Sequence, residues 1–155
     1  MSFIKAKEHL KKYGYEDKIM EFDVSSATVK DAALALNCDE DEIAKTLSFI
    51  VNDKPILIVV SGSSKIDNSK YKQEFKTKAK MIPFDEVENK IGHAAGGVCP
   101  FGINNEIDVY LDISLKSHEI IYPACGSSNS AVKLTIDELE KSSMFKKWID
   151  VSKKN

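Results

Sequence analysis

Residues Gly92 to Ile103 read Gly-His-Ala-Ala-Gly-Gly-Val-Cys-Pro-Phe-Gly-Ile, and the rest of the chain is organised around this stretch. It holds four of the seven glycines and one of the four prolines. A helix interior is disfavoured, because glycine is entropically costly there and proline lacks the N–H. Apolar side chains such as Val98 and Phe101 argue against a solvated linker. Such a loop can present backbone N–H groups to a phosphate, a carboxylate or a developing oxyanion, and a tight buried turn is an equally good interpretation.

The bulk composition is that of an ordinary water-soluble protein. The chain has 155 residues, of which 43% are hydrophobic and 30% are charged, so we expect a single domain over residues 1–155. No apolar run approaches the ~18 residues that a membrane helix needs. Lysines interrupt the first twelve residues, which argues against a secretory signal. We therefore expect a cytoplasmic protein that does not contact a membrane.

Charge and cysteine usage narrow the possible partners. The net charge is −2, and all 22 basic residues are lysines. Without arginine the chain lacks bidentate guanidinium contacts to guanine or phosphate, so we do not expect it to bind DNA. The three cysteines are widely spaced and form no C-x-x-C pair, which predicts neither a disulfide framework nor a zinc site. We expect no metal and no cofactor.

The apolar pattern predicts helices and strands in an irregular order. Strands at 45–51 and 56–60 are expected to form a hairpin around the turn 52–55, with the nearly continuous apolar return strand central in its sheet. Further strands are expected at 19–24, 107–112, 119–122 and 131–134, and helices at 3–13, 26–36, 84–91 and after a capping box formed by Thr135 and Glu138. This order predicts a mixed α/β fold, in which helices surround a strongly curved mixed sheet.

Four motifs, taken together, resemble one family. They are the helix 26–36, the segment 42–49 with the sequence Glu-Ile-Ala-Lys-Thr-Leu-Ser-Phe, the loop 96–102 and the small-residue loop 123–129. Their order and spacing are similar to those of the YbaK-type aminoacyl-tRNA deacylases, which are related to the editing domain of bacterial prolyl-tRNA synthetases. The resemblance spans nearly the whole chain. It implies a partly barrel-like YbaK-like fold and hydrolysis, by water, of the ester that joins a wrong amino acid to a tRNA, most often the tRNA for proline.

The resemblance also implies roles for particular residues. The essential lysine of the family falls on Lys45, and the loop that closes over the terminal adenosine falls on 96–100. Lysine at the start of a strand could hold a phosphate or ribose, stabilise developing charge, or simply be solvated. Backbone N–H groups of the glycine loop are candidate oxyanion donors. We therefore predict a catalytic set of Lys45, Gly96 and Gly97, and a substrate-binding set of Thr28, Val98, Cys99, Pro100, Gly126, Ser127 and Asn129.

Several alternatives remain at this stage. Thr28 could contact the aminoacyl group or only cap its helix, and Cys99 with His93 could form a thiol nucleophile and base, although a buried structural cysteine is commoner. The loop 123–130 lacks the histidine that relatives acting on alanyl-tRNA carry. A methyl group at Gly97 is expected to lower turnover with little loss of stability.

The expected partner is the aminoacylated acceptor end of a tRNA, with docking on prolyl-tRNA synthetase left open. Residues 65–80 carry six lysines against two acidic residues, which is either a solvated helix face or a tRNA contact. We assign tRNA binding to Lys72, Lys76 and Lys78. The alternative to an enzyme is a non-catalytic module of the same fold that binds an aminoacyl-tRNA or an adenylate-like ligand.

Overall fold

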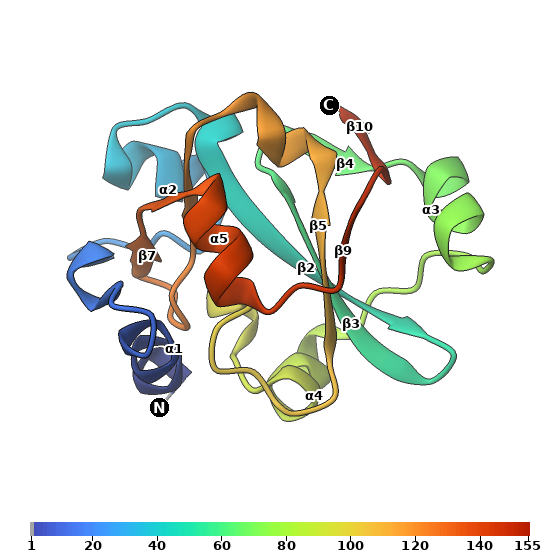
Figure 1. Ribbon diagram of the computed structural model, residues 1–155, viewed down its shortest axis with the longest axis horizontal. Coiled ribbons are helices and arrows are strands. Elements are labelled where there is room, and N and C mark those ends of the chain that lie inside the picture. Colours follow the sequence, from blue (N-terminus) through green and yellow to red (C-terminus); the bar gives the residue numbers. More distant parts are fainter. Residues whose placement is uncertain (1) are drawn as a thin grey trace.

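The computed structural model describes residues 2–155 and has a mixed sheet at its centre (Figure 1). Six strands follow the order β8-β6-β2-β3-β5-β9, and two small two-stranded pairs, β1 with β7 and β4 with β10, flank them. The strands are β1 (Ile19–Glu21), β2 (Ile43–Val51), β3 (Lys54–Ser61), β4 (Ser64–Ile66), β5 (Asp108–Asp112), β6 (Ile120–Pro123), β7 (Ser130–Val132), β8 (Leu134–Thr135), β9 (Lys147–Ile149) and β10 (Ser152–Lys154). The predicted mixed α/β fold is confirmed.

Helices pack around this sheet. Among residues 2–155 there are five α-helices: α1 (Ser2–Lys11), α2 (Val29–Leu36), α3 (Asn68–Phe75), α4 (Val87–Ile91) and α5 (Ile136–Ser143). Figure 1 places α2 near one end of the long axis of the molecule and α3 at the other. None of the helices in this range is long and apolar enough to cross a membrane.

The hairpin β2–β3 is the centre of the fold. Its strands pair antiparallel from Ala44 opposite Ser61 to Val51 opposite Lys54, whereas β3 pairs parallel with β5. Residues 57–60 of β3 are almost fully buried, because alternate side chains face two different cores. Leu57 and Val59 belong to the main core, and Ile58 and Val60 to a second core under Tyr71 of α3. The central position predicted for this strand is confirmed.

Several predicted boundaries are wrong. The strand expected at 19–24 ends at Glu21, and the strand expected at 131–134 is divided between β7 and β8. The helix expected at 84–91 begins as a 3₁₀ turn and is α-helical only from Val87. The strands β4, β9 and β10 have no counterpart in the sequence-based prediction. Each is three residues long, which is too short for an alternating pattern to be recognised.

The N-terminal helix packs against the loops around the glycine-rich stretch. The Gly102 N–H donates to Nδ1 of His9 over 3.1 Å, and Nε2 of His9 lies 2.6 Å from the Ser142 carbonyl oxygen. His9 is therefore neutral, with its proton on Nε2, and connects α1 to both the loop and α5. Burial lowers the pKa of His9 below its ordinary value of 6.5, because the charged imidazolium is poorly solvated there. Burial lowers the pKa of His93 in the same way.

We expect these two histidines to make the protein less stable in mild acid. A base whose pKa is lowered on folding binds protons more readily in the unfolded state. Its stabilising contribution is complete above pH 6.5 and is lost as the pH falls below this value. We expect the melting temperature to fall between pH 7.5 and pH 5.5, and to fall less in His9→Gln, in which only the His93 part remains. Thermal unfolding across this pH range measures the melting temperatures of the wild type and of His9→Gln. An equal fall in melting temperature with pH in the two proteins would contradict the role assigned to His9.

Candidate functional site

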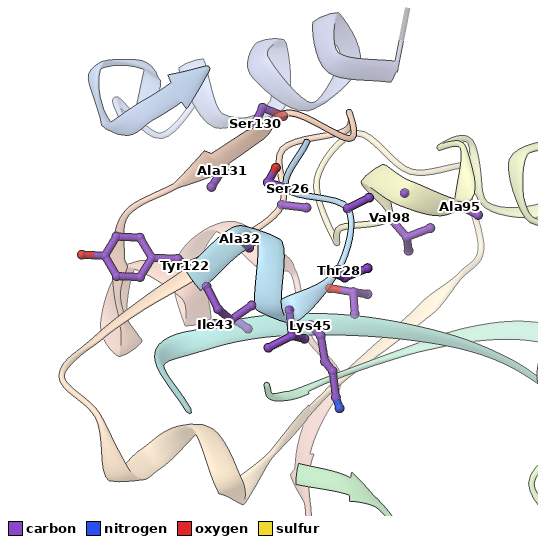
Figure 2. A pocket seen from close by; sticks show the side chains of 16 residues that line it. Ser26, Thr28, Ala32, Ile43, Lys45, Ala95, Val98, Tyr122, Ser130 and Ala131 are labelled. Atoms are coloured by element: carbon purple, nitrogen blue, oxygen red, sulfur yellow. The ribbon is translucent and has the colours of Figure 1, made fainter. Parts of the chain in front are cut away.

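A small cavity lies where α2, the start of β2 and two loops meet (Figure 2). Its volume is about 100 Å³. In Figure 2, Tyr122 and Ala131 lie on one side of it, Ala95 and Val98 lie on the other, and α2 crosses between them. The lining residues are Ser26, Ala27, Thr28, Val29, Ala32, Ile43, Ala44, Lys45, Thr46, Ala95, Gly96, Val98, Tyr122, Ala124, Ser130 and Ala131.

The N-terminus of α2 forms one wall of the cavity. Thr28 caps this helix, because its hydroxyl accepts from the Asp31 N–H at 3.1 Å. The helix dipole places partial positive charge at this end, and Lys45 also lines the cavity. Both features favour a negatively charged group in the cavity.

Lys45 is half-buried near the start of β2, and in Figure 2 its side chain points away from Thr28 and the other labelled residues. Its Nζ donates to the Gly62 carbonyl oxygen at 3.4 Å. Burial lowers the pKa of Lys45, since desolvation disfavours the ammonium form. The side chain of Lys45 is therefore held in place and is not a freely solvated strand-end lysine.

The glycine-rich loop forms an adjoining wall of the cavity. It contains a 3₁₀ turn, Ala95–Gly97, in which the Gly97 N–H donates to the Ala94 carbonyl oxygen at 2.9 Å. Gly97 is therefore not free to donate to an oxyanion. The following N–H, that of Val98, has no acceptor among residues 2–155, and Val98 lines the cavity. Val98 is the better candidate for an oxyanion donor.

The glycine-rich loop packs closely against two other segments of the chain, around Ala27 and around Ser128. A methyl group added at Gly96 would lie 3.1 Å from Cβ of Ser128 and 3.3 Å from Cβ of Ala27. The segment 26–28 is in turn fixed to Ser128, whose carbonyl oxygen accepts from the Ser26 N–H at 2.6 Å. Three segments that are distant in the sequence therefore form one rigid wall around the cavity.

The structure brings together only part of the predicted site. Lys45, Thr28, Gly96 and Val98 all line the cavity. Gly97, Cys99, Gly126, Ser127 and Asn129 do not line it; Ser127 donates to Asn129 Oδ1 at 3.0 Å, and Asn129 donates to the Phe22 carbonyl oxygen at 3.0 Å. Pro100 lines a different cavity, of about 570 Å³, on the α1 side of the loop.

The predicted tRNA-binding lysines lie far from the cavity. Lys72 belongs to α3, Lys76 ends this helix with φ of 61°, and Lys78 follows. In Figure 1, α3 lies at the opposite end of the molecule from α2. A tRNA that touches both regions would have to extend along the long axis of the protein.

Cys99 is placed as a structural residue and not as a nucleophile. Its side chain is fully buried, and burial raises the pKa of the thiol far above its ordinary value. Nε2 of His93 lies 3.5 Å from Cys99 Sγ but 2.6 Å from the Phe101 carbonyl oxygen. Nε2 must therefore carry the proton that it donates to this carbonyl, and it cannot accept one from the thiol. The geometry offers no general base for a thiolate mechanism.

Replacing Cys99 should consequently have little effect on the predicted hydrolysis. For the ester hydrolysis by water that the sequence predicts, we expect Cys99→Ser and Cys99→Ala to retain a rate of the same order of magnitude as the wild type. Loss of a true covalent nucleophile would cost a factor on the order of a million. Single-turnover deacylation assays distinguish the two cases, and a trapped thioester in the wild type would refute the direct attack of water.

Sequence reasoning missed part of the lining. Thr46 has the most notable side chain of these residues, since its Oγ1 is buried without a hydrogen-bond partner among residues 2–155. A buried hydroxyl without a partner is costly, and a ligand in the cavity could satisfy it. The other missed residues are Ser26, Ala27, Val29, Ala32, Ile43, Ala44, Ala95, Tyr122, Ala124, Ser130 and Ala131. Most are small or apolar and come from separate segments, so no local pattern marks them. Among residues 2–155, no group of three histidine, cysteine or acidic side chains could hold a metal ion.

Comparison with known proteins gives a consistent result. The chain is 47% identical over 154 residues to the uncharacterized protein YwhH of Bacillus subtilis, with 99% of this chain and 98% of that protein covered. It is 32% identical over 104 residues to a proline–tRNA ligase of Shouchella clausii, a match that covers 66% of this chain and 18% of the ligase.

A crystal structure of a candidate trans-editing enzyme for prolyl tRNA synthetase superimposes with a TM-score of 0.87. The two are 27% identical, and 98% of this chain and 97% of the other are covered. The family model for the aminoacyl-tRNA editing domain matches residues 24–142, a range that contains the whole lining of the small cavity. This chain belongs to the aminoacyl-tRNA editing domain family.

Proposed function

We propose that this protein hydrolyses the ester bond of a mischarged aminoacyl-tRNA, and that the tRNA for proline is its main substrate. The observation that carries the proposal is the small cavity, whose lining includes Lys45, the capping residue Thr28 of α2, and Val98, whose N–H has no acceptor among residues 2–155. The family supports aminoacyl-tRNA as the ligand. The likeness to part of a proline–tRNA ligase supports the choice of tRNA.

The proposed ester hydrolysis needs only a water molecule and hydrogen-bond donors to the developing oxyanion. A water oxygen attacks the ester carbonyl carbon, the carbonyl oxygen gains negative charge, and the ribose oxygen leaves with a proton. The Val98 N–H and the Lys45 ammonium are the groups that would stabilise this charge, or Lys45 would hold the nearby phosphate or ribose. One donor of this kind contributes ~3–4 kcal/mol to the stability of the transition state.

The size of the cavity limits the amino acid that can be removed. A cavity of about 150 Å³ lined by apolar side chains holds one benzene molecule, and this cavity measures about 100 Å³. Its apolar wall includes Ala32, Ile43 and Ala131. We propose that the substrate carries a small amino acid and that aromatic side chains are excluded.

A panel of tRNAs charged with different amino acids tests the proposal. We expect turnover at low protein concentration for small mischarged amino acids on the tRNA for proline. Tight binding without turnover would instead indicate a non-catalytic module. Addition of prolyl-tRNA synthetase to the same assay tests whether the protein acts alone or docked on the synthetase.

The lysines of α3 provide a separate prediction about tRNA binding. Each phosphate contact that is lost reduces the slope of log affinity against log salt by about 0.7–0.9. Changing Lys72, Lys76 and Lys78 together to alanine should weaken binding and reduce the slope by roughly two to three. The amino-acid preference should not change. Binding across a salt series measures the slope, and identical slopes would mean that the tRNA lies elsewhere.

A further inference from the structure

We infer that Asp41 is a positioning residue for Lys45, and that it acts through the turn Ser61-Gly62-Ser63. The inference rests on the proposed function, since it concerns the same ester hydrolysis. Lys45 and Asp41 are not in direct contact. The connection is the Gly62 carbonyl oxygen, which accepts from Lys45 Nζ at 3.4 Å.

The carboxylate of Asp41 fixes this turn on both sides of Gly62. Asp41 Oδ1 accepts from the Ser61 hydroxyl at 2.8 Å and from the Ser63 hydroxyl. The Ser61 hydroxyl also lies 2.8 Å from the Asp41 carbonyl oxygen. Two hydroxyl groups that flank one residue and bond to one carboxylate leave the carbonyl group between them little freedom to rotate.

Two further side chains hold the carboxylate itself. His118 Nε2 lies 2.8 Å from Asp41 Oδ2, and Lys154 Nζ lies 3.2 Å from Oδ1. The hydrogen bond from Ser63, followed by that from His118, lowers the pKa of the Asp41 carboxyl well below its ordinary value. Asp41 therefore remains a carboxylate at neutral pH, with donors from three separate segments around it.

Gly62 itself lies between the Asp41 carboxylate and the cavity wall and has little room to move. Its N–H donates to the Ile43 carbonyl oxygen at 2.7 Å. A methyl group added at Gly62 would lie 2.7 Å from Val29 Cγ1 and 3.1 Å from Ile43 Cβ. Val29 and Ile43 both line the cavity. A shift of this turn would therefore move the Lys45 acceptor and the cavity wall together.

The test compares Asp41→Asn and Ser63→Ala with a matched control. Asp108→Asn removes the charge of an exposed carboxylate that accepts from one lysine, Lys146, at 3.3 Å, and it lies outside the cavity. Misplacement of a catalytic group by about 1 Å can cost a hundredfold in rate. We expect kcat for deacylation to fall tenfold to a hundredfold in both test variants, with KM for the tRNA nearly unchanged. Asp108→Asn should retain wild-type kcat.

A second measurement reports on Lys45 without relying on activity. Reductive methylation with ¹³C-formaldehyde labels the lysines, and Lys45→Arg identifies the Lys45 signal by its loss. In the wild type and in Asp108→Asn, this signal should stand apart from those of solvated lysines. In Asp41→Asn and Ser63→Ala, the Lys45 signal should move to the chemical shift of the solvated lysines.

The two measurements separate the possible failures. If the wild type deacylates no tRNA of the panel, the proposed function fails, and the NMR signal alone decides whether Asp41 positions Lys45. An unmoved Lys45 signal in Asp41→Asn, or an unchanged kcat in an active protein, overturns the inference. Ser63→Ala removes a single hydroxyl, so it keeps the test valid if Asp41→Asn does not fold.

Discussion

Lys45→Ala is expected to reduce the rate of deacylation by a factor of about a hundred to a thousand. This is the usual effect of losing one group that stabilises an oxyanion. Among residues 2–155, Lys45 has the single positively charged side chain in the cavity lining. Its Nζ donates to the Gly62 carbonyl oxygen at 3.4 Å, which restricts its position before substrate binds. Water entering the space left by Lys45→Ala would be a poor substitute, because it carries no charge and is not fixed.

The fold should survive this change. Lys45 is half-buried and makes one long hydrogen bond, so we expect a loss of about 1 kcal/mol or less in the free energy of unfolding. Lys30→Ala serves as a matched control, since Lys30 is exposed in the first turn of α2 and does not line the cavity. Single-turnover deacylation and thermal unfolding measure the two effects. Wild-type turnover in Lys45→Ala would remove this residue from the mechanism.

Local chemistry explains which parts of the fold could be predicted from the sequence. The hairpin 45–60 has an apolar return strand and a strong turn. Thr28 caps α2, and Thr135 with Glu138 forms the predicted capping box. In each case a few neighbouring residues determine the structure. By contrast, β9 pairs parallel with β5, with Trp148 opposite Leu111, and no local pattern can indicate a partner so distant in the chain.

The site was only partly predictable for the same reason. Lys45, Thr28, Gly96 and Val98 lie within motifs, and the structure places them in one cavity. Asp41 lies in an acidic stretch that looks solvated in the sequence. Its donors Ser61, His118 and Lys154 are 20, 77 and 113 residues away. Only the folded arrangement shows that they meet at one carboxylate.

Gly97 is the residue for which the structure most changes the expected result. A methyl group there would lie 2.5 Å from the carbonyl carbon of Gly126 and 2.7 Å from Cα of Ser127. These are backbone atoms of another loop and cannot move aside as a flexible side chain would. We therefore expect Gly97→Ala to lose about 1–3 kcal/mol of stability through overpacking, or roughly 2–10 °C in melting temperature. This expected loss replaces the prediction from the sequence that Gly97→Ala would lower turnover with little loss of stability.

Gly96→Ala is the matched comparison that separates packing from chemistry. Its added methyl group would meet the Cβ atoms of Ser128 and Ala27 at 3.1 and 3.3 Å, which requires only small shifts, and Gly96 lines the cavity whereas Gly97 does not. Gly96→Ala should therefore melt close to the wild type and lose turnover because the cavity narrows, with the largest loss for the bulkiest amino acid accepted. Gly97→Ala should lose stability and turnover together, for all amino acids alike. Melting curves and deacylation of the same tRNA panel compare the two variants. A stable Gly97→Ala with an altered amino-acid preference would instead place Gly97 in direct contact with the substrate.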